Sequence, residues 1–151
     1  MKKKRSARLS VVLDLEERKK KQADKFLSDH VKRVENDKSQ LIQLENYLKE
    51  YQEQYKVTCK QGVSVQNLLS YQAFMAKIGT VIAQHKESMK VNEEQLAGVR
   101  QYWIKVYARH NAVDSLIGRI KVKERDAEDK TLQKLIDEAS QLNASRKTNK
   151  F

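Results

Sequence analysis

The sequence predicts an all-α fold in which one chain forms a long antiparallel two-helix coiled coil. Three observations support this prediction. The 151 residues include no proline and four glycines, and 34% are charged, a composition typical of long helices. Apolar residues recur in alternating steps of four and three along two stretches, as in a coiled coil. A short segment with turn-forming residues separates the stretches. We therefore expect residues 1–151 to form a single helical hairpin.

The first helix is predicted over residues 6–57. Its apolar residues recur in steps of four and three, and the residues between them are mostly charged or carry amide side chains. The recurring positions therefore define one buried seam. The predicted seam residues are Leu9, Leu13, Glu16, Lys20, Ala23, Leu27, His30, Val34, Asp37, Leu41, Leu44, Leu48, Tyr51 and Tyr55.

The turn is predicted at residues 58–65. Gly62 can adopt the positive φ that ends a helix, and Ser64 can cap the next helix. A short connection makes the two helices antiparallel neighbours.

The second helix is predicted over residues 66–143, followed by a basic tail at 144–151. Two successive steps of four at Phe74, Ile78 and Ile82 predict a stutter, an irregularity that locally unwinds a supercoil. The predicted seam residues are Tyr71, Phe74, Ile78, Ile82, His85, Met89, Asn92, Leu96, Val99, Trp103, Val106, His110, Val113, Ile117 and Ile120.

Pairing the two helices outward from the turn places Leu48 near Phe74 and Leu9 near Val113. Residues beyond about 118 then have no partner, so the second helix should overhang the first. Apolar positions return there in a different phase, at Leu132, Leu135, Ala139 and Leu142.

The net charge of +11 is concentrated near the ends of the sequence. Residues 1–25 carry +6 and residues 141–151 carry +3. The basic ends could keep the protein soluble, enter an acidic ring or rest on anionic lipid. The single Cys59 excludes an internal disulfide, and no apolar run is long enough for a membrane helix. These features predict a soluble cytoplasmic protein without a secretory signal.

No catalytic motif is present. The sequence lacks a phosphate-binding glycine loop, an HExxH motif and any Cys/His cluster. His30, His85 and His110 are far apart, and the seam positions of the last two favour partly buried structural histidines. We therefore expect no enzyme activity, cofactor or metal.

Residues 71–85, YQAFMAKIGTVIAQH, form the most apolar stretch of the chain. The pattern Tyr71-Gln72-x-Phe74, then Ile78, Ile82 and Gln84-His85, with Trp103 and the DEAS sequence at 137–140, resembles the FliJ family. These proteins are coiled-coil stalks of the flagellar type III export ATPase complex, and virulence secretion systems have similar stalks. The resemblance covers roughly residues 65–141.

The resemblance implies a hairpin like the γ stalk of rotary ATPases. It also implies three partners: a hexameric export ATPase (FliI-like) whose assembly and activity the stalk promotes, an export gate protein (FlhA-like), and export chaperones. A member of this family would be cytoplasmic and peripherally associated, through these partners, with the inner membrane at the flagellar base.

The resemblance also suggests site residues. The gate-binding motif of the family matches Phe74, Ile78, Val81 and His85, which share one helical face by steps of four, three and four. We expect Ile82 to face the first helix instead. The unpaired overhang is the candidate ATPase-binding segment, with the residues Lys121, Lys123, Arg125, Leu132, Leu135 and Ile136.

Two alternative functions remain at this stage. The sequence pI of about 9.7 would suit a nucleic-acid-binding coiled coil, and a generic adaptor would have the same periodicity. Acidic residues interrupt the first basic cluster at Asp14, Glu16, Glu17 and Asp24, however, whereas a DNA-binding basic helix has an uninterrupted cluster. We therefore expect no nucleic acid as partner.

Overall fold

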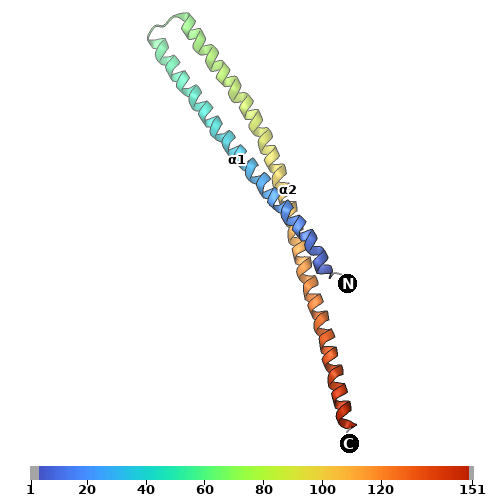
Figure 1. The fold of residues 1–151 in the computed structure, drawn as a ribbon. Coiled ribbons are helices and arrows are strands. Elements are labelled where there is room, and N and C mark those ends of the chain that lie inside the picture. Colours follow the sequence, from blue (N-terminus) through green and yellow to red (C-terminus); the bar gives the residue numbers. More distant parts are fainter. Residues whose placement is uncertain (1–3, 150–151) are drawn as a thin grey trace. The chain divides into compact units, whose positions relative to one another are not determined.

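The computed structural model describes residues 4–149 of the chain and contains two helices (Figure 1). Helix α1 spans Arg5–Lys60 and helix α2 spans Val65–Thr148. No strand is present among the described residues. This confirms the predicted all-α fold of two long helices packed against each other. Helix α2 extends five residues beyond its expected end at 143, so the proposed basic tail is helical as far as Thr148.

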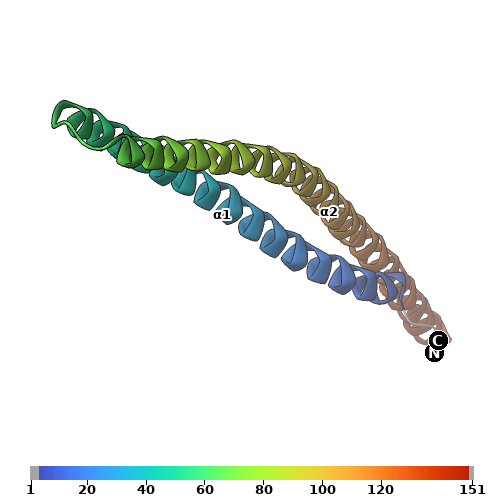
Figure 2. The same ribbon diagram turned by 90° about the horizontal axis from the view of Figure 1, so that it is seen from above.

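Residues 61–64 form the turn, which is shorter than the expected segment 58–65. Gly62 has a φ of 75°, as predicted. The backbone N–H of Gln61 donates to the carbonyls of Val57 and Thr58, both at 3.2 Å. At the start of α2, the N–H groups of Asn67 and Leu68 donate to the Ser64 carbonyl at 3.1 and 3.2 Å. The two helices leave this turn in the same direction (Figure 2), so they run antiparallel along the chain.

The described residues divide into two units. The turn unit comprises Lys21–Lys105 and includes the turn. The terminal unit comprises Met1–Lys20 and Val106–Phe151. In each unit a segment of α1 pairs with a segment of α2.

In the turn unit, the buried and half-buried positions of α1 match the predicted seam. Ala23 and Val34 are buried there. The other seam positions of this segment are half-buried: Leu27, His30, Asp37, Leu41, Leu44, Leu48, Tyr51 and Tyr55. Ile78 and Ile82 are the buried apolar residues on the facing helix.

The predicted stutter in α2 is wrong. Met75 is half-buried, whereas Phe74 is 38% exposed. The seam therefore passes from Tyr71 through Met75 to Ile78 in steps of four and three, which is the regular coiled-coil repeat. The unbranched Met75 side chain fills the position between the helices, and the bulky Phe74 ring lies beside it.

Near the turn, the helices pair close to the predicted register. Phe74 contacts Tyr47 and Tyr51, which lie on either side of the expected neighbour Leu48. Polar contacts fix the register further along the turn unit. Asn92 Nδ2 donates to Asp37 Oδ2 at 2.7 Å, and Trp103 Nε1 donates to Asp24 Oδ1 at 2.8 Å.

In the terminal unit, α1 pairs with α2 beyond the expected limit at residue 118. Val106, Ile117 and Ile120 are buried. Ser6 hydrogen-bonds to Glu124, and Lys4 forms an ion pair with Glu128. The unpaired part of α2 therefore begins after Glu128. It is the orange-to-red segment that continues past the start of α1 in Figure 1.

Candidate partner-binding surfaces

An aromatic cluster joins the two helices in the turn unit. Tyr51 lies at the centre, with its ring centroid 4.6 Å from that of Phe74, 5.1 Å from that of Tyr47 and 6.3 Å from that of Tyr71. Tyr55 also contacts Tyr71. Tilted and edge-on pairs at these distances stabilise beyond the area that they bury. A hydrogen bond with Tyr47, together with burial, raises the pKa of Tyr51.

The four predicted gate-binding residues do not share one exposed surface. Phe74 and Val81 are 38% and 43% exposed, whereas Ile78 is 7% exposed because it packs in the seam. His85 is half-buried, and its Nε2 lies 2.8 Å from the Asp37 carbonyl oxygen. Because a carbonyl only accepts, this nitrogen carries the proton and donates it. Ile82 is buried while Val81 is exposed, as the sequence predicted for this pair.

Sequence reasoning missed the contribution of α1 to this surface. Tyr47 is 47% exposed and contacts Phe74 from the opposite helix, with 6.5 Å between their ring centroids. Its spacing of four from Tyr51, and of four again to Tyr55, was a usable signal, because such residues share a helix face. We call Tyr47, Phe74 and Val81, with Tyr51 beneath them, the aromatic surface.

The overhang of α2 presents an apolar stripe. Every described residue from Arg125 onward is exposed. Leu132, Leu135 and Ile136 are 57%, 57% and 51% exposed, and Leu142 is 63% exposed. We call these four residues the overhang stripe. Spacings of three, four and seven place them on one side of the helix.

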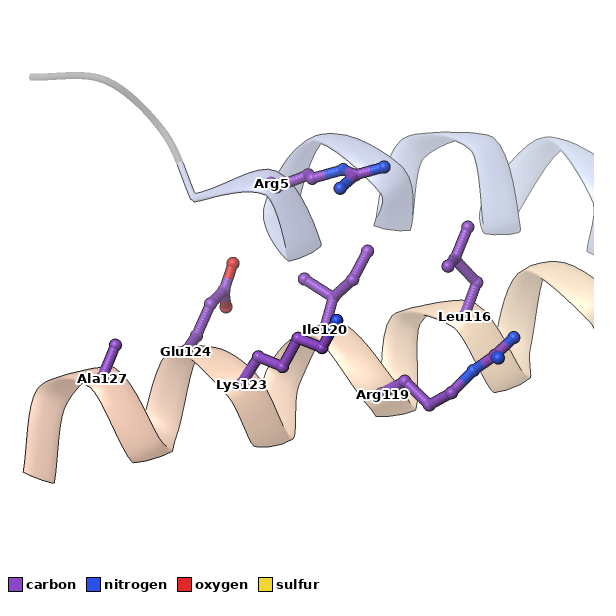
Figure 3. A pocket seen from close by; sticks show the side chains of 7 residues that line it. All are labelled: Arg5, Leu116, Arg119, Ile120, Lys123, Glu124 and Ala127. Carbon is purple, nitrogen blue, oxygen red and sulfur yellow. The ribbon is translucent and has the colours of Figure 1, made fainter.

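The basic residues predicted for the same site are divided between two faces. Lys121, Arg125 and Leu132 follow one another at spacings of four and seven, so they lie on one face. Lys123 instead lines a cavity of about 380 Å³ between the start of α1 and α2. Arg5 and Arg119 also line that cavity, and Figure 3 shows Leu116 and Ile120 pointing toward α1.

Glu124 binds the first turn of α1 at the edge of this cavity (Figure 3). It accepts from the Ser6 hydroxyl at 2.6 Å and from the Ser6 backbone N–H at 3.1 Å. These hydrogen bonds lower the pKa of Glu124. Helix α1 has no acidic residue in its own first turn, so α2 supplies the negative charge that a helix N-terminus favours. The neighbouring Glu128 raises the pKa of Lys4.

A buried polar layer lies further along the seam of the terminal unit. Glu16 is 1% exposed, and its Oε1 is 3.0 Å from Arg109 Nε. Its Oε2 is buried without a hydrogen-bond partner, as is Nε2 of His110. That His110 nitrogen lies 3.7 Å from Glu17 Oε1. Buried charges of this kind add little net stability, but they can specify how helices align.

Neither a metal centre nor a membrane span is found in the described part of the chain. No group of three or more His, Cys, Asp or Glu side chains there is placed to hold a metal ion. No helix within residues 4–149 is both long enough and apolar enough to cross a membrane.

Comparison with known proteins identifies the family. The model of the flagellar FliJ protein family matches residues 5–149. No curated protein and no solved structure matches the chain. The family match covers both helices and the turn between them, including the part of α1 in which the sequence offered only periodicity. The chain therefore belongs to the flagellar FliJ protein family.

Proposed function

We propose that this protein is a non-enzymatic stalk that binds a hexameric export ATPase, promotes its assembly and activity, contacts the export gate and binds export chaperones. Family membership implies a role related to flagellar protein export. The FliJ family comprises structural coupling components rather than known enzymes. The observation that carries the proposal is the overhang stripe on α2, which has no partner among the described residues.

Binding of the ATPase through the overhang has a physical rationale. Exposed leucine and isoleucine side chains gain roughly 1.5–3 kcal/mol each when a partner fully buries them. Four such residues on one side of a helix are more than scattered surface hydrophobics. Lys121 and Arg125 extend the same face toward the paired part of the helix, which would allow charge complementarity with an acidic ring lining.

A truncation tests this contact. Deleting residues 129–151 should abolish stimulation of the cognate ATPase and leave the melting temperature unchanged, because the described residues removed are all exposed. The full-length variant L132Q/L135Q/I136Q should have the same effect. Val91→Gln is the matched control, since Val91 is 50% exposed and lies in the paired part of α2, outside the overhang. Full stimulation by the truncated protein would place the ring contact elsewhere.

The aromatic surface is the proposed gate contact. It combines two exposed aromatic rings from different helices with an exposed aliphatic residue, Val81, one heptad beyond Phe74. Aromatic residues that are only partly covered in the free protein are common binding hot spots.

Two single substitutions, one on each helix, test the gate contact. Phe74→Ala and Tyr47→Ala should each weaken gate binding about tenfold or more, with ATPase stimulation retained. Tyr102→Ala is the matched control, because Tyr102 is a similarly exposed aromatic residue of α2 at 42%. Equal losses for all three variants, or unchanged binding by Phe74→Ala, would refute this assignment.

A further inference from the structure

Two aliphatic residues near the start of α1 lie on the side that faces away from α2. Val11 is 69% exposed and Leu15 is 50% exposed. The seam residues of this segment include Leu9, Leu13 and Glu16. At 100° per residue, Val11 and Leu15 lie on the opposite side of the helix from that seam. They therefore contribute little to helix pairing in the terminal unit.

Cations surround these two aliphatic residues. Arg8 and Arg18 lie on the same face, because the spacings from each to Val11 and Leu15 are three and seven. Among the described residues, neither Arg8 nor Arg18 takes part in an ion pair. Asp14 is the acidic residue nearest to the centre of this face. We call Arg8, Val11, Leu15 and Arg18 the basic-aliphatic face.

We propose that the basic-aliphatic face binds an anionic lipid bilayer. A helix with aliphatic residues flanked by Lys and Arg on its exposed side suits the interface of a negatively charged membrane. The face is convex, since it is the outer side of a single helix. A bilayer adapts to such a surface, whereas a protein partner would need a matching groove. This inference goes beyond the stalk function and does not depend on it.

The expected mode of binding follows from the side chains. Val11 and Leu15 would enter the boundary between head groups and acyl chains. The long side chains of Arg8 and Arg18 would extend sideways, so that their guanidinium groups reach lipid phosphates. The attraction would weaken as salt is added, because exposed charges are screened.

Vesicle co-sedimentation of the full-length protein tests the proposal. The probe is a vesicle of equal parts phosphatidylcholine and phosphatidylglycerol, compared with a vesicle of phosphatidylcholine alone. We expect binding to the anionic vesicle only. The variant R8Q/R18Q should bind on the order of thirtyfold more weakly, from the contribution of each basic residue near an anionic surface. The variant V11Q/L15Q, which keeps the charge, should bind about tenfold more weakly or worse.

Matched controls change the same residue types elsewhere. K49Q/K56Q removes two exposed cations of α1, and V91Q/I104Q replaces aliphatic residues of α2 that are 50% and 54% exposed. Both controls should bind anionic vesicles like the unmodified protein. All variants should keep their helical circular dichroism signal, because every substituted residue is exposed.

A fluorescent probe tests insertion directly. Cys59 is the only cysteine, so Cys59→Ser allows an environment-sensitive dye to be placed by Val11→Cys or, as the control, Val91→Cys. Anionic vesicles should shift the emission to the blue for the dye at position 11 and not at position 91. The proposal is overturned by equal binding to neutral vesicles, by controls as weak as the face variants, or by V11Q/L15Q binding as tightly as the unmodified protein.

Discussion

Phe74 and Ile78 are one helical turn apart on α2, yet only Ile78 is buried against α1. The family resemblance assigns both residues to one binding surface. The structure divides them, because Ile78 is in the seam and Phe74 is beside it. A substitution at Ile78 would therefore lower the stability of the helix pair and would not remove a direct contact with a partner.

Ile78→Ala should lower the free energy of unfolding by about 2–4 kcal/mol, through lost burial and a cavity in the seam. Val81→Ala is the control, and it should change that free energy by less than about 0.5 kcal/mol because Val81 is on the surface. Chemical denaturation measures both variants. Similar losses in the two variants would contradict the assignment of Ile78 to the seam.

The interaction between Glu124 and Ser6 should make the local stability of the first turn of α1 depend on pH. Its pKa is lowered in the folded protein by the hydrogen bonds from Ser6. The contribution of these hydrogen bonds to the stability of the fold is therefore fully present above the pKa of an unfolded glutamate. It is lost as pH falls from about 4.5 through the lower pKa of the folded state. The first turn of α1 should then lose protection from hydrogen exchange.

Nuclear magnetic resonance titration of the Glu124 carboxylate checks this interaction. Ser6→Ala should raise the pKa of Glu124 toward its ordinary value, because the hydroxyl donor is removed. Ser10→Ala is the control, since the Ser10 hydroxyl donates to the Ala7 carbonyl at 2.6 Å instead. An unchanged Glu124 pKa in Ser6→Ala would show that this hydrogen bond is absent in solution.

At the scale of the elements, glycines in the interior of α2 lower the stability of this helix. Gly98 and Gly118 are exposed within the helix, and an added Cβ would meet no atom within 4 Å. Gly98→Ala and Gly118→Ala should each raise the free energy of unfolding by about 1 kcal/mol. Gly62→Ala should instead lower it by about 1–2 kcal/mol, since its φ is 75°. Thermal unfolding of the three variants compares the effects, and a loss of stability on either helical substitution would contradict this prediction.

At the scale of the whole molecule, each helix finds its partner within the same chain. The isolated protein should be almost entirely helical and monomeric, because the seams of α1 and α2 cover each other. Circular dichroism and analytical ultracentrifugation measure these two properties. A substantial β signal, or a stable dimer at micromolar concentration, would contradict the intramolecular pairing.

Few apolar residues support the fold. Only seven in the described part of the chain are buried: Ala23, Val34, Ile78, Ile82, Val106, Ile117 and Ile120. The folded state is therefore expected to be only marginally stable. Binding of the ATPase or another partner should raise the melting temperature, by an amount that grows with the logarithm of the partner concentration once this exceeds the dissociation constant.

The sequence alone determined which elements form and which side of each is buried. Its repeat of four and three identified the seam of α1 from Leu9 to Tyr55, and Gly62 and Ser64 located the turn. These features are local: a helix places residues three and four apart on one side, and a positive φ suits glycine. The overhang was expected from the unequal lengths of the helices, because pairing outward from the turn leaves no residue of α1 opposite the last part of α2.

Only the tertiary structure decided which residues meet across the two helices. Periodicity within one helix does not fix its alignment along another. That alignment depends on contacts between distant residues, such as Asp37 with Asn92 and Ser6 with Glu124. The same packing placed Met75 rather than the adjacent Phe74 in the seam, because Met75 continues the regular repeat from Tyr71 to Ile78. The exposed position of Phe74 is thus a property of the helix pair, which neither helix has by itself.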